Sequence, residues 1–220
     1  PHESLFAREL RREMSQDLAW FSQHYFRTDD GEHFKFKDFH IEMMRAMSDE
    51  EIERFILLEP ASFGKTTTVK HYLCWLPCMD SNVQIVLGCK TADDAVARLG
   101  VVKSEMEGND ELVNDFGPFV GPIWRDDSIQ VAGAPTRKDP TITAIGSTSS
   151  IYGKRATHFI GDDIVTLQNS GPQVEPKTRD RLTTMTVAHA FPRTLESAGL
   201  PRLTPHGLRH GVATRLMAQG

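Results

Sequence analysis

The residues best suited to chemistry form two short motifs. The first, Glu59-Pro-Ala-Ser-Phe-Gly-Lys-Thr66, lies between an apolar run and a helix-like stretch, which is the setting of a phosphate-binding loop. The usual pattern has Gly where this chain has Glu59. Lys65 is expected to reach the β- and γ-phosphates of ATP, and the Thr66 hydroxyl to bind Mg²⁺. The expected nucleotide-binding residues are Ser62, Phe63, Gly64, Lys65, Thr66 and Thr67.

The second motif, His158-Phe-Ile-Gly-Asp-Asp163, is a short apolar run that ends in two carboxylates. Asp162 is expected to hold Mg²⁺ through water, and Asp163 to polarise the attacking water. The carboxyl ends of neighbouring parallel strands converge on one ligand site, so the two motifs can act together. An ordinary strand end with a solvated acidic turn is the alternative. With Lys65 and Asp163 as catalytic residues and ATP and Mg²⁺ as cofactors, the motifs predict nucleotide hydrolysis.

The elements that must position these motifs predict an α/β fold of the phosphate-loop NTPase type, with a mainly parallel sheet flanked by helices. A helical extension is expected over residues 1–33, the ATPase domain over 34–182, and a separate fragment with a short helix over 183–220. A less regular region from Asn109 to Ser150 contains short β-like pieces such as Ser128–Val131. Strands are expected at Phe55–Glu59, Val83–Gly88 and His158–Asp162, and helices at Leu5–Phe26, His40–Met47, Thr66–Leu76 and Thr91–Glu107.

The composition excludes several protein classes. Hydrophobic residues make up 39% and charged residues 25% of the 220 residues, as in ordinary globular proteins. No apolar run reaches the ~18 residues of a membrane span, so no membrane partner is expected. Three cysteines are too few for a disulfide scaffold and indicate a reducing compartment. The net charge of −5 is uneven, because Arg181–Gly220 contains five Arg and one Glu.

Four segments together resemble the ATPase domain of the phage terminase large subunit, over about Phe34 to Arg181. The resemblance implies an ATPase that moves double-stranded DNA into a capsid as a homo-oligomeric ring. It also implies the portal and the small terminase subunit as partners, and the host cytoplasm as the location. The segments are Phe36–Met44, Glu59–Thr67, Cys89–Ala95 with Asn109–Leu112, and Ile151–Asp163.

The chain departs from the family pattern at three positions. Ala61 and Tyr152 stand where the family often has Arg, and Asp163 where it often has Glu. An arginine stabilises charge on the transferred phosphoryl group, and Arg155, Arg98 or a neighbouring subunit could replace the missing one. The family's coupling motif and nuclease domain are not found beyond the acidic motif.

The last thirty residues resemble a different family, the tyrosine recombinases or phage integrases. The resemblance lies in His206-Gly-Leu-Arg-His210, which Thr204 and Pro205 place at the start of a helix. His206, Arg209 and His210 are then expected to bind a phosphate. No tyrosine nucleophile follows, so no strand cleavage is expected. The alternative functions are a recombinase fragment acting in DNA strand transfer and a non-catalytic nucleotide-binding remnant.

Two smaller groups of residues are candidate sites. Cys74 and Cys78 lie four residues apart near His71, but Pro77 is expected to interrupt the helix and a zinc site needs about four ligands. Buried structural thiols are therefore the favoured interpretation. His40, ahead of the phosphate loop, could touch adenine, although a capping or surface role is favoured.

Overall fold

The computed structural model describes residues 5–49, 51, 52, 55, 57, 63–135, 137–147, 149 and 155–164. The chain divides into two compact units, one of Pro1–Ser48 with Thr66–Thr166 and the other of Asp49–Lys65 with Leu167–Gly220. In the second unit, Asp49 begins a turn in which its backbone oxygen accepts a hydrogen bond from the Ile52 amide, with an N···O distance of 3.1 Å. No helix in the described part of the chain has the length and hydrophobicity needed to cross a membrane.

Within its described residues, the first unit contains a five-stranded sheet, which confirms the predicted α/β class. The strand order is β2-β3-β4-β1-β5, and β1 runs parallel to both β4 and β5. β2 and β3 are antiparallel to their neighbours, so the sheet is mixed. The strands are β1 (Ile85–Cys89), β2 (Val120–Trp124), β3 (Ser128–Val131), β4 (Ile142–Gly146) and β5 (His158–Gly161).

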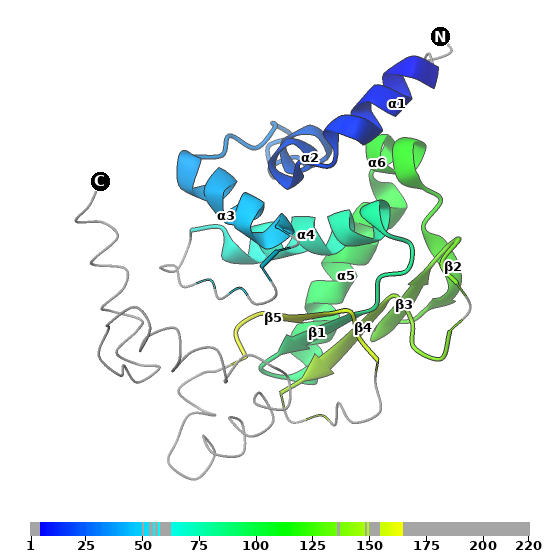
Figure 1. The fold of residues 1–220 in the computed structure, drawn as a ribbon. Coiled ribbons are helices and arrows are strands. Elements are labelled where there is room, and N and C mark those ends of the chain that lie inside the picture. Colours follow the sequence, from blue (N-terminus) through cyan, green and yellow to red (C-terminus); the bar gives the residue numbers. More distant parts are fainter. Residues whose placement is uncertain are drawn as a thin grey trace, which may run out of the picture. The chain divides into compact units, whose positions relative to one another are not determined.

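In the part of the chain that the structure describes, six helices accompany the sheet (Figure 1). They are α1 (Leu5–Met14), α2 (Leu18–Tyr25), α3 (Asp38–Ser48), α4 (Lys65–Met79), α5 (Ala92–Gly108) and α6 (Asp110–Phe116). α5 follows β1 directly, and the Thr91 side chain accepts a hydrogen bond from the Asp94 amide at its start. This N-cap fixes where the strand ends and the helix begins.

The prediction of a single helix over Leu5–Phe26 is wrong, because the structure has two helices there. The break comes at Asp17, whose side chain accepts hydrogen bonds from the amides of Ala19 and Trp20 at 2.7 and 3.0 Å. An aspartate in this role starts a new helix, because it satisfies amides that have no partner inside the helix.

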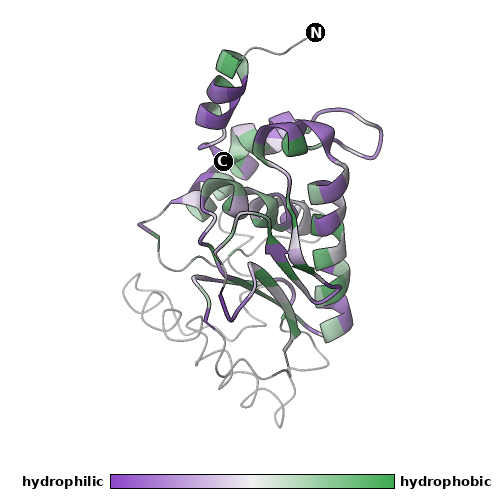
Figure 2. Ribbon diagram, turned by 90° about the vertical axis from the view of Figure 1, so that its right-hand side faces the viewer, coloured by the Kyte–Doolittle hydropathy of each residue, from purple (hydrophilic) through white to green (hydrophobic). Residues whose placement is uncertain are grey.

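α1 contacts the rest of the first unit through its charged side chains and not through its apolar ones. Arg11 donates two hydrogen bonds to the buried carboxylate of Asp115, at 2.6 and 2.8 Å, and Arg8 and Arg12 donate to the Asp115 backbone oxygen. Tyr25 donates to the same carboxylate at 2.7 Å. No residue of α1 is buried, and the helix projects from its neighbours in Figure 2. Its exposed apolar side chains are Leu5, Phe6, Leu10 and Met14.

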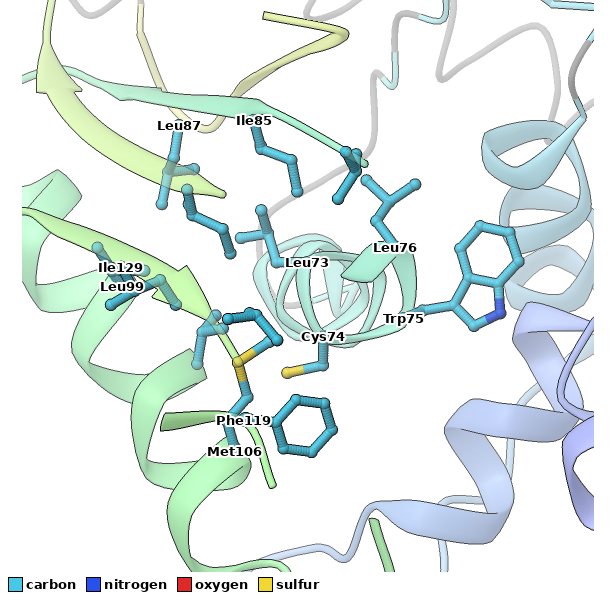
Figure 3. Packing of buried hydrophobic residues seen from close by; sticks show 14 of the residues in the cluster. Leu73, Cys74, Trp75, Leu76, Ile85, Leu87, Leu99, Met106, Phe119 and Ile129 are labelled. Atoms are coloured by element: carbon cyan, nitrogen blue, oxygen red, sulfur yellow. The ribbon is translucent and has the colours of Figure 1, made fainter. Parts of the chain in front are cut away.

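The hydrophobic core lies on one face of the sheet, where α4 and α5 pack. Ile85 and Leu87 of β1 point to this face, while Val86 between them points to the other, because side chains alternate along a strand. Figure 3 looks along α4 and shows Leu73 facing Ile85 and Leu87. Leu99 of α5 is completely buried in the same cluster. This packing fixes both helices against the strands.

The expected strand at Phe55–Glu59 is not confirmed. The structure describes only two of its residues, Phe55 and Leu57, and neither lies in a strand. The other predicted strands correspond to β1 and β5, and the predicted helices after Thr66 and Thr91 correspond to α4 and α5. Pro77 does not interrupt its helix, because α4 continues to Met79. In the last turn, a proline removes only one hydrogen bond of the helix.

Candidate functional site

The candidate site lies at the carboxyl edge of the parallel strands. β5 leads directly into Asp162, whose backbone amide donates to the Gly88 oxygen of β1 at 2.9 Å. This bond continues the β1–β5 ladder by one residue and draws the carboxylate into the protein, where Asp162 is only 6% exposed. Burial of an ionised carboxylate is costly unless a partner compensates for it.

The compensating partner is Arg98 of α5. Its Nε atom donates to Asp162 Oδ2 at 2.9 Å. The arginine side chain is 43% exposed, whereas that of Asp162 is 6% exposed, so the guanidinium reaches inward from solvent to a fixed carboxylate. From the sequence, Arg98 is only one of several possible substitutes for a missing arginine, because no local signal pairs two residues 64 positions apart.

Asp163 differs from Asp162 in both exposure and backbone conformation. It is exposed and has a φ of 51°, in the left-handed region. Aspartate tolerates this conformation better than most residues, but it remains uncommon outside glycine. The chain thus turns sharply after β5, so that the two consecutive carboxylates have different environments. Such an outlier at the end of a strand is typical of functional sites.

Gly146 at the end of β4 lets two backbone segments meet at the same edge. A β-carbon at this position would lie 2.6 Å from the backbone nitrogen of Ala92, at the start of α5. The Ser147 amide donates to the Cys89 oxygen at 2.8 Å, which joins the ends of β4 and β1. Burial and the nearby Asp162 charge raise the pKa of the Cys89 thiol to about 11. The edge is therefore closely packed around Asp162.

The described residues of the predicted phosphate loop form a turn that enters α4. Gly64 has a φ of 81°, which side chains other than glycine rarely adopt. Lys65, Thr66 and Thr67 are the first three residues of α4, and its first turn contains no acidic residue. The amino end of a helix that lacks acidic residues favours the binding of an anion. Phe63 is 38% exposed, and Ser62 lies outside the described residues.

Lys65 and Asp162 belong to different units of the chain. The structure brings together Asp162, Arg98 and the ends of β1 and β5. Arg155 is placed elsewhere. It precedes β5, and its amide donates to Asp139, which precedes β4, at 3.2 Å. Because the four residues of β5 span about 13 Å, Arg155 lies at the opposite end of the strand from Asp162.

The donor set suits Mg²⁺ only in the company of a nucleotide. The described residues contain no cluster of three or more His, Cys, Asp or Glu that could enclose a metal ion. Mg²⁺ is commonly held by one or two carboxylates together with phosphate oxygens and water. Asp162 supplies a buried carboxylate and Thr66 a hydroxyl, which are oxygen ligands of the kind that Mg²⁺ takes together with phosphates.

The expected phosphate-binding residues of the tail, His206, Arg209 and His210, lie outside the described residues, as does Tyr152. Searches of protein-family models and of curated proteins find no match to this chain. The resemblances to a terminase and to a recombinase therefore stay predictions from the sequence.

Proposed function

We propose that this chain is the ATPase module of a phage DNA-packaging motor, which hydrolyses ATP to translocate double-stranded DNA into a capsid. The observation that carries the ATPase part is the placement of Asp162 and Asp163 at the carboxyl edge of parallel strands, one buried and the other exposed. Ligands of open α/β sheets bind at this edge. The link to DNA packaging, with the portal and small terminase subunit as partners, rests on the four resembling segments.

The proposed reaction is attack of water on the γ-phosphorus of ATP. The bond between this phosphorus and the β,γ-bridging oxygen breaks, and ADP and inorganic phosphate leave. Asp163, which is exposed at the turn, would orient the water and accept its proton. Lys65 would bind the β- and γ-phosphates, and Thr66 and Asp162 would hold Mg²⁺. When bound, Mg²⁺ neutralises charge on the phosphate oxygens.

Steady-state ATP hydrolysis with Mg²⁺ tests the proposal. Asp163→Asn is expected to lower turnover about 10²–10⁴-fold, the usual contribution of a general base, with little change in ATP binding. Lys65→Ala is expected to weaken binding as well. Asp126→Asn is the matched control, because this carboxylate is 93% exposed and lies in the turn between β2 and β3. Equal turnover in wild type and Asp163→Asn would contradict the proposed role.

Two further measurements separate the alternatives. ATP binding without turnover in the wild type would indicate the non-catalytic nucleotide-binding remnant. ATP-dependent displacement of a triplex-forming strand from double-stranded DNA tests translocation, with a readout other than phosphate release. No described residue bears on the recombinase alternative, because His206 and its neighbours lie outside the described part of the chain.

A further inference from the structure

Arg98 uses only part of its hydrogen-bonding capacity on Asp162. The contact is made by Nε, whereas a guanidinium group carries five N–H donors in a planar fork. Within the described part of the chain, the two terminal amino groups of Arg98 make no hydrogen bond, and 43% of the side chain is exposed. A cation is thus held in place beside the candidate site, with most of its donors directed to no group among the described residues.

The surroundings of Arg98 favour a negatively charged ligand that carries several oxygens. A buried carboxylate anchors one edge of the guanidinium, so little side-chain freedom remains to be lost on binding. The terminal amino groups match the spacing of two phosphate oxygens, to which arginine commonly binds in a bidentate manner. Arg155 cannot provide the same contact, because it lies at the amino end of β5.

We infer that Arg98 binds the terminal phosphate of the nucleotide through its amino groups while its Nε atom keeps Asp162 in position. This inference rests on the proposed function and adds to it a residue from α5 that distinguishes ATP from ADP. Arg98 stabilises the negative charge that spreads over the phosphate oxygens as the γ-phosphoryl group is transferred.

The test is calorimetric titration with ATPγS and with ADP, each in the presence of Mg²⁺. Arg98→Gln is expected to bind ATPγS about 10- to 100-fold more weakly, which is the usual effect of losing hydrogen bonds between charged groups, and to bind ADP as the wild type does. Arg125→Gln is the matched control. This exposed arginine follows β2, and its side chain makes no hydrogen bond within the described part of the chain.

Arg98→Gln removes a cation from the buried carboxylate of Asp162 and could unfold the protein. Asp162→Asn with Arg98→Gln removes both charges, and comparing it with Asp162→Asn alone isolates the effect of the arginine. Selective loss of ATPγS affinity in this comparison supports the inference. An equal loss of affinity for both nucleotides, or no loss of affinity for either, overturns the inference but does not contradict the proposed function. If the wild type binds neither nucleotide, the proposed function fails together with the role of Arg98.

Discussion

Replacement of His71 by phenylalanine is expected to stabilise the protein. His71 of α4 is completely buried, with its ring stacked on Phe26 at a centroid distance of 3.9 Å and against the edge of Phe34 at 5.0 Å. Neither ring nitrogen has a hydrogen-bond partner among the described residues. An unsatisfied buried polar group costs about 1–3 kcal/mol, so His71→Phe should raise the free energy of unfolding by about that amount at pH 7.

The same substitution should change the pH dependence of stability. Burial, and next the neighbouring Lys70 charge, hold the pKa of His71 well below 6.5 in the folded protein. As the pH falls through 6.5, the unfolded chain takes up a proton that the folded one does not, so stability decreases. Between pH 7 and pH 5 this one group accounts for up to about 2 kcal/mol. The advantage of His71→Phe over the wild type should therefore grow as the pH falls.

Urea denaturation of both proteins at pH 7 and pH 5, followed by tryptophan fluorescence, measures the effect. His24 and His158 also have lowered pKa values, mainly through burial, but they are present in both proteins and cancel in the difference. His40→Phe is the control for replacing a histidine by a phenyl ring and should give no gain at pH 7, because it removes the His40 Nδ1 atom that accepts a hydrogen bond from the Lys37 amide. A difference between His71→Phe and wild type that is identical at both pH values would refute the reasoning.

Two further pairs of variants test the packing of the first unit. Gly146→Ala should lower stability by about 1–3 kcal/mol, because the added carbon meets the backbone at the start of α5, whereas Gly100→Ala, in open space on α5, should raise it by up to ~1 kcal/mol; thermal denaturation of both variants compares them. On α6, Asp115→Ala should cost about 3 kcal/mol, because it breaks a buried pair with Arg11. Glu111→Ala removes an exposed pair from the same helix and should cost less than about 1 kcal/mol. Equal losses for the two α6 variants in urea denaturation would contradict the burial argument.

Local patterns were sufficient for the elements on either side of the candidate site. The apolar run at Val83–Gly88 and the helical stripe after Thr91 predicted β1 and α5, since both signals lie within one element. β4 was missed although it is central in the sheet. Ile142–Gly146 is short, Thr143 interrupts its apolar residues, and it lies in a region rich in glycine and proline. β1 is equally buried, but its unbroken apolar run Ile85–Leu87 marks it as a strand.

The candidate site itself was predicted only in part. The carboxylates were found from their place after an apolar run, but their different environments depend on the turn after β5 and on the contact with Arg98. That contact joins residues from two elements and leaves no pattern in either. The same limit applies to Asp115, whose partner Arg11 lies 104 positions away. Long-range ion pairs of this kind are determined by the packing of elements, which the periodicity of a single segment does not encode.

The two outer strands of the described sheet differ in the features that limit pairing with another chain. The outer strand β2 contains Pro122, which has no N–H to donate, and the register between Val120 and Trp124 is irregular. Both features discourage intermolecular pairing, and proteins use them to limit aggregation. The opposite end of the described sheet, β5, contains neither proline nor an irregular register. The sequence of β2 therefore disfavours templated pairing of partly unfolded copies through that strand.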